Sequence, residues 1–177
     1  MKYPFCYLLS GIVLLFLSGS CNKADDQAPG FDMFYQREFF IPPGIGIFDV
    51  HHFQMENIPT TYNQLLDQHG KKTEDITGVI TAKGSIGGTF GDADLDFIDK
   101  VSVRVYDESD PSDWIEIAYR DPMPLDPGNN FALIPSLADA KRFMSKSRFS
   151  IDVVLWLRNT TQEESQVRLD LQMKATY

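Results

Sequence analysis

The stretch RFSIDVVLWLRN, residues 148–159, decides the fold class because its apolar side chains recur at every second position. Successive side chains of an extended strand point to opposite faces, so a period of two puts one apolar set on one face of a sheet. That set consists of Phe149, Ile151, Val153, Leu155 and Leu157. Ser150, Asp152 and Arg158 fall on the opposite face. The stretch therefore predicts a strand with one face in the core and one polar face.

The same alternation recurs along most of the chain. Residues 165–177, SQVRLDLQMKATY, repeat it after the polar turn NTTQEE, so we expect an antiparallel hairpin. Further strand-like segments occur at residues 34–41, 47–58, 75–86, 100–107, 113–121 and 129–134. Two segments have helical spacing instead: residues 61–70, which end at Gly70, and residues 136–145, in which Ser136 is a candidate N-cap. The sequence thus predicts an all-β domain, an antiparallel β-sandwich of about eight strands with one or two short connecting helices.

The N-terminus has the layout of a secretory signal. Residues 7–17, YLLSGIVLLFL, carry no charge and are too few for a spanning helix, which needs about 20 apolar residues. Three small residues then precede Cys21. This arrangement resembles the lipobox of bacterial lipoproteins, with Ser18 where that motif usually has leucine. The resemblance implies that Cys21 is the lipidated residue; an ordinary secretory signal with an incidental cysteine is the alternative.

This resemblance implies a division of the chain and a location. Residues 1–20 would be the signal peptide, 21–32 the lipidated cysteine with a polar tether, and 33–177 the β-sandwich domain. Two or more acyl chains hold a protein stably on a membrane. The acidic cluster at 23–26 resembles the surface-export tags of Bacteroidota lipoproteins, and the whole chain resembles the small β-sandwich envelope lipoproteins of those bacteria. We therefore expect a lipid-anchored protein of the outer membrane, on its periplasmic or its exposed face.

Composition narrows the classes of function. The chain has 16 basic and 25 acidic residues, and loss of residues 1–20 would remove only Lys2 from the charged set. Such an acidic balance argues against nucleic acid and against anionic lipid surfaces as partners. With Cys6 in the signal and Cys21 lipidated, no thiol would remain for a disulfide or for catalysis. The sequence also lacks a Gly-x-Ser-x-Gly turn, and we expect no enzymatic activity.

One acidic loop has the residue types of a calcium site. Asp92, Asp94 and Asp96 occupy alternate positions, as at the start of a calcium-binding loop. An EF-hand would then need glycine and glutamate where this chain has Phe97 and Val103, so the loop is not an EF-hand. Calcium is accordingly an optional cofactor, and the alternative is a solvated acidic loop.

Outward-facing aromatic side chains form the candidate surface for a partner or ligand. Val154 and Trp156 fall on the otherwise polar face of residues 148–157, and Trp114 begins another strand beside acidic residues. Exposed aromatics of this kind stack on sugar rings or serve as hot spots for proteins. The alternative is that the helix of residues 136–145 covers Trp156 in a second small core.

Two functions follow from these observations. The first is a non-enzymatic, lipid-anchored envelope module that binds or supports another envelope protein. The second is a surface lipoprotein that binds a glycan or another ligand, with or without calcium. The exposure of Trp114 and Trp156 separates the two.

Overall fold

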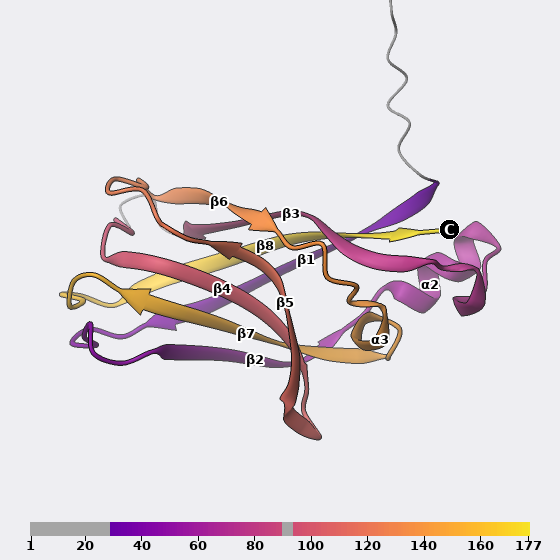
Figure 1. The fold of residues 1–177 in the computed structure, drawn as a ribbon, viewed down its shortest axis with the longest axis horizontal. Helices are drawn as coiled ribbons and strands as arrows, with labels where there is room; N and C mark the ends of the chain where they lie inside the picture. The colour runs from indigo at the N-terminus through magenta and orange to yellow at the C-terminus, as the bar shows by residue number, and fades with distance from the viewer. Residues whose placement is uncertain (1–28, 90–93) are drawn as a thin grey trace, which may run out of the picture.

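The computed structural model describes residues 29–89 and 94–177. Eight strands make up most of this part of the chain (Figure 1). They are β1 (Gly30–Ile41), β2 (His51–Pro59), β3 (Gly78–Gly88), β4 (Ile98–Asp107), β5 (Asp110–Arg120), β6 (Asn130–Pro135), β7 (Arg148–Leu157) and β8 (Ser165–Thr176). The helices are α2 (Tyr62–His69), α3 (Lys141–Met144) and the short 3₁₀ helix η1 (Thr73–Asp75). The predicted all-β class, with eight antiparallel strands and two short helices, is confirmed.

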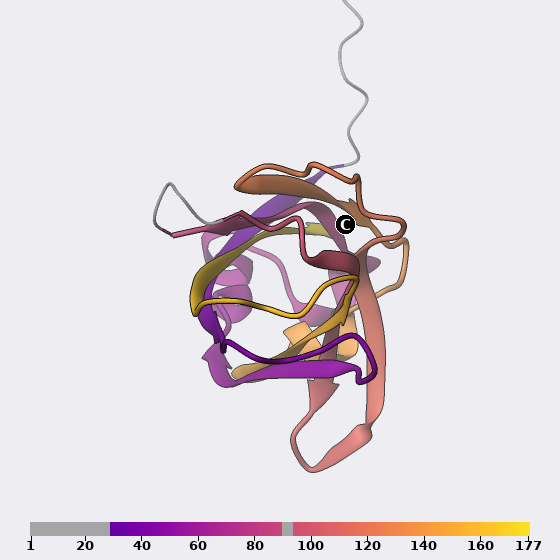
Figure 2. The same cartoon turned by 90° about the vertical axis from the view of Figure 1, so that its left-hand side faces the viewer.

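The strands form one curled sheet in the order β1-β8-β3-β6-β5-β4-β7-β2, and each neighbouring pair is antiparallel. The sheet folds into two layers, one of β1, β8 and β3 and the other of β5, β4, β7 and β2. Strand β6 joins them, because its residues 130–133 pair with β3 and its last two residues pair with β5. Seen end-on, the sheet nearly closes on itself (Figure 2). The result lies between a sandwich and a flattened barrel, with the apolar residues of both layers in one core.

The inward set predicted for β7 is in that core. All five side chains, Phe149, Ile151, Val153, Leu155 and Leu157, are buried. The expected polar face of β7 is buried as well, since Ser150, Asp152 and Val154 are almost inaccessible to solvent. Strand β7 has β4 on one side and β2 on the other, so it lies in the interior of the sheet and its outer face is crowded by neighbours.

The two predicted helices have different outcomes. Helix α2 ends at Gly70 in the left-handed conformation, φ 61°, as its sequence indicates. Helix α3 is shorter than expected, because the Ser136 hydroxyl accepts a hydrogen bond from the Ala138 N–H and makes a local turn that precedes the helix. Phe143 and Met144 of α3 are buried in the main core, so this helix does not cover the outer face of β7.

The two ends of the molecule differ. The start of β1, helix α2 and the C-terminus lie together at one end (Figure 1), where the Tyr177 N–H donates to the Pro29 carbonyl. The β1–β2, β5–β6 and β7–β8 connections lie at the other end, with the described part of the β3–β4 connection, and we call this the loop end. The β4–β5 hairpin extends away from the body at one side (Figures 1 and 2).

Candidate functional site

Val154 does not belong to an exposed surface. Its side chain is 0 % exposed, and the prediction that it lies on a contact surface is wrong. It lies in register between His52 of β2 and Ser102 of β4, outside the main core. Polar pairs cross this outer face: His52 Nδ1 lies 2.7 Å from Asp152 Oδ2, and the Ser102 hydroxyl donates to Glu116. Val154 is therefore inaccessible to a partner.

Trp156 is half-buried and already has partners inside the protein. The Lys100 ammonium lies 5.0 Å from the centre of its ring, within the range of a cation–π contact. Lys100 also pairs with Asp121 at 2.7 Å. The cation over this ring leaves Trp156 less surface for a partner than its sequence position suggests, and its binding role stays a prediction.

Trp114 is the more accessible of the two indoles, with 44 % of its surface exposed. It lies on β5 in the β4–β5 hairpin, directly opposite Tyr106 of β4. The Arg104 guanidinium lies 4.0 Å from the centre of the Trp114 ring and stacks against it. An indole that is oriented by a cation and still open to solvent is a suitable anchor for a partner.

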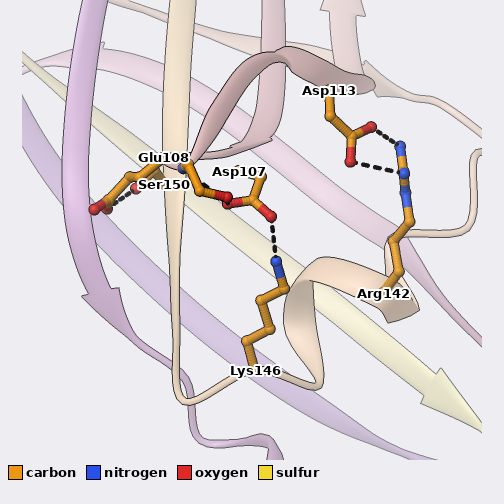
Figure 3. Close-up of polar contacts among 7 residues, drawn as sticks. Asp107, Glu108, Asp113, Arg142, Lys146 and Ser150 are labelled. Atoms are coloured by element: carbon orange, nitrogen blue, oxygen red, sulfur yellow. Dashed lines mark hydrogen bonds and ion pairs between the residues drawn. The ribbon is translucent and has the colours of Figure 1, made fainter.

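Polar contacts of three acidic side chains hold the hairpin against the body (Figure 3). Arg142 of α3 binds both carboxylate oxygens of Asp113, at 2.5 and 2.9 Å. Lys146 lies 2.5 Å from Asp107. Glu108 accepts hydrogen bonds from the Ser150 hydroxyl and from the Asn57 N–H. These contacts join the turn end of the hairpin to α3, β7 and β2, so the acidic side chains fix the tip of the hairpin to the body.

The charge state of this bracing is fixed near neutral pH. The Lys146 ammonium and the Ser109 side chain and N–H hold the pKa of Asp107 well below its usual range. The Ser150 hydroxyl and the Asn57 N–H lower the pKa of Glu108. Burial, with Glu56, Asp152 and Glu108 nearby, raises the pKa of Tyr106 to about 12. None of these three groups would exchange a proton near pH 7, which suits a structural or binding role better than general acid–base catalysis.

The predicted calcium loop is only partly described. Asp92 lies outside the described residues, as does Cys21. The Asp94 carboxylate accepts the Asp96 N–H at 3.0 Å, a local turn contact. Both residues line a cleft of about 730 Å³ together with Glu163 and Glu164. Within residues 29–89 and 94–177, no group of three or more histidine, cysteine or acidic side chains is arranged to hold a metal ion.

A second hollow lies on the outer face of the layer that contains β1, β8 and β3. It is an apolar trough of about 660 Å³ over β1, β8, β3 and β6. Phe34, which is 70 % exposed, lines it together with Ala132 and Pro135, and Gln36, Asp170 and Gln172 supply polar groups. An exposed ring beside amide and carboxylate groups has the chemistry to hold a sugar.

Several residues that shape these surfaces could not be identified by sequence reasoning. Thr161, in the predicted polar turn of residues 159–164, is buried and hydrogen-bonds across the loop end. The partners of Asp107 and Asp113 lie more than 25 residues away along the chain, and neither shares a strand or helix with its partner. The only local signal of a structured turn is the run of acidic and serine residues around Pro111 in DESDPSD, residues 107–113.

Comparison with known proteins adds no assignment: no family model matches this sequence, and no curated protein matches it. In the part of the chain that the structure describes, no helix is long and apolar enough to cross a membrane.

Proposed function

We propose that this protein is a lipid-anchored module of the bacterial cell envelope that binds or supports another envelope protein without catalysing a reaction. The observation that carries the binding role is the β4–β5 hairpin, in which Trp114 is exposed and the ion pairs of Asp107 and Asp113 fix the tip to the body. A preformed arm loses little conformational entropy on binding, so its exposed indole can contribute to affinity. The anchor is inferred from the resemblance of residues 18–21 to a lipobox.

Photo-crosslinking in intact cells tests this role. A photoreactive phenylalanine replaces Trp114, and the matched control places it at Asn63 on the exposed surface of α2. We expect a discrete crosslinked protein band with position 114 and none with position 63. The same adduct from both positions, or none from position 114, would contradict a partner at the hairpin.

A glycan ligand is the second candidate function, because of the trough around Phe34. Phe34→Ala would abolish retention on an immobilised polysaccharide if a sugar stacks on this ring, whereas Phe40→Ala, a change of another exposed phenylalanine on β1, would not. Equal retention of the two variants would exclude the trough as the sugar site.

A further inference from the structure

The loops of the loop end form one connected platform. Thr161 of the β7–β8 loop exchanges backbone hydrogen bonds with the β1–β2 loop, with the Gly44 N–H at 2.9 Å and the Ile45 carbonyl at 3.1 Å. Arg158 links two further loops, since its N–H donates to the Phe97 carbonyl at 2.9 Å and its guanidinium donates to the Met123 carbonyl at 3.0 Å. All four connections are thereby tied to one another, and side chains on them have defined positions.

Large apolar side chains project from this platform into solvent. Phe48 is 93 % exposed and Leu125 is 86 % exposed, and Ile47 and Val50 are also exposed. Nine large apolar side chains are exposed among the described residues. Four of them lie here, Ile47, Phe48 and Val50 in the β1–β2 loop and Leu125 in the β5–β6 loop. Ile47, Phe48 and Val50 lie within four residues of one another, and soluble proteins rarely leave such groups uncovered together unless the surface has a partner.

The charge of the platform indicates the chemistry of that partner. The described parts of the four connections, residues 42–50, 94–97, 121–129 and 158–164, contain seven acidic residues and a single basic one, Arg158. Arg158 is mostly buried and is committed to Asp99 and Met123. Asp96, Asp126, Glu163 and Glu164 form no ion pair with any described residue. Asp94, Asp96, Glu163 and Glu164 line the same cleft of about 730 Å³.

We propose that the loop end docks a basic segment of a partner protein, in which lysine or arginine residues flank an apolar side chain. The carboxylates of the cleft would receive the cationic groups, and Phe48 would contact the apolar one. A second copy of this chain would bring like charges together, and an anionic membrane surface would be repelled. This surface is separate from the β4–β5 hairpin, so the proposal is independent of the proposed function.

Fluorescence anisotropy with a synthetic peptide provides the test. The probe is fluorescein-labelled KKFKKLKK, and the full chain is kept in a nonionic detergent. We expect saturable binding that weakens as salt rises, because the contacts are largely ionic. The double change Glu163→Gln with Glu164→Gln should weaken binding roughly tenfold, the effect of removing two exposed charges. Phe48→Ser should weaken binding at low and at high salt alike.

Matched controls at the opposite end separate this docking from simple attraction to an acidic protein. Asp67→Asn with Glu74→Gln also removes two exposed carboxylates, and Leu137→Ser removes an equally exposed apolar group. These variants should bind the peptide as the unchanged chain does. Absence of binding, or equal weakening by the control variants, would overturn the proposal. Displacement of the peptide by 1 mM calcium at constant ionic strength would overturn it in favour of a cation site.

Discussion

Replacement of Thr161 by valine tests how much one buried hydroxyl contributes to holding the loop end together. Thr161 is 3 % exposed, its hydroxyl donates to the Pro42 carbonyl at 2.8 Å, and it accepts the Ile45 N–H at 3.1 Å. Valine has nearly the same shape but makes neither bond, so the Pro42 carbonyl and the Ile45 N–H both lose this partner. The β1–β2 loop would then lose its side-chain attachment to the β7–β8 loop.

The expected cost follows from these two bonds. At roughly 1 kcal/mol each, Thr161→Val should lower the free energy of unfolding by about 2 kcal/mol. For a domain of this size that corresponds to a fall of about 4–8 °C in Tm. Thr161→Ser is the matched control, because it keeps the hydroxyl and removes one buried methyl group, worth about 0.8 kcal/mol.

Urea unfolding of the two variants and of the unchanged chain measures these differences. Amide hydrogen exchange adds a local readout, since the Ile45 N–H should exchange faster in the valine variant. If the valine variant proves as stable as the unchanged chain, the hydroxyl contributes nothing and the reasoning about the loop end is refuted. A loss of stability with unchanged exchange at Ile45 would refute the proposed attachment of the loop.

Three further predictions concern the anchor, the buried outer face and the hairpin. Cys21→Ala should abolish labelling by a clickable palmitate analogue, and equal label on both forms would contradict lipidation at this position. Val154→Ala should lower the free energy of unfolding by about 2 kcal/mol, because apolar burial is lost and a cavity is left. Val50→Ala, at an exposed site, should lower it by less than about 0.5 kcal/mol in the same urea experiment. Similar values for the two variants would contradict the burial of Val154. The pKa values of Asp107 and Glu108 are lowered in the folded protein. The two carboxylates therefore stabilise the fold at any pH above their unfolded pKa values near 4. This contribution is lost as the pH falls from there through the lower folded pKa values. The urea midpoint should therefore fall less between pH 6 and pH 3 in the double variant Asp107→Asn with Glu108→Gln, and an unchanged pH dependence would contradict the bracing of the hairpin.

The alternation in residues 148–157 was enough to predict the strand and its core face, because the period of side chains along a strand is a local property. It could not predict that Asp152 and Val154 are also buried. Their burial depends on the neighbours of β7 in the sheet, and on His52, which lies 100 residues away along the chain. A sequence pattern in one strand contains no information about which strands flank it.

The candidate binding surfaces likewise depend on contacts between segments that a local sequence pattern does not reveal. Trp114 is exposed, but the sequence did not indicate the Arg104 cation against its ring or the ion pairs to α3, because these contacts join different elements of the fold. The exposed Phe48 lay in a segment predicted to be a strand from residue 47. The structure begins β2 only at His51, and the loop before it is attached to Thr161 through Gly44 and Ile45. The binding roles of all these residues stay predictions.

The pairing of β1 with β8 has a mechanical consequence. The two strands pair over twelve residues, from Gly30 with Thr176 to Ile41 with Ser165. Hydrogen bonds of an antiparallel ladder run perpendicular to the strands. A force that pulls β1 lengthwise from Gly30, while the loop end is held, acts along the strands and loads the whole ladder at once in shear. The bonds cannot then open one after another, as they would if the edge strand were peeled away. A chain tethered at its N-terminus and loaded at its far end would therefore carry tension through the longest strand pairing of its fold.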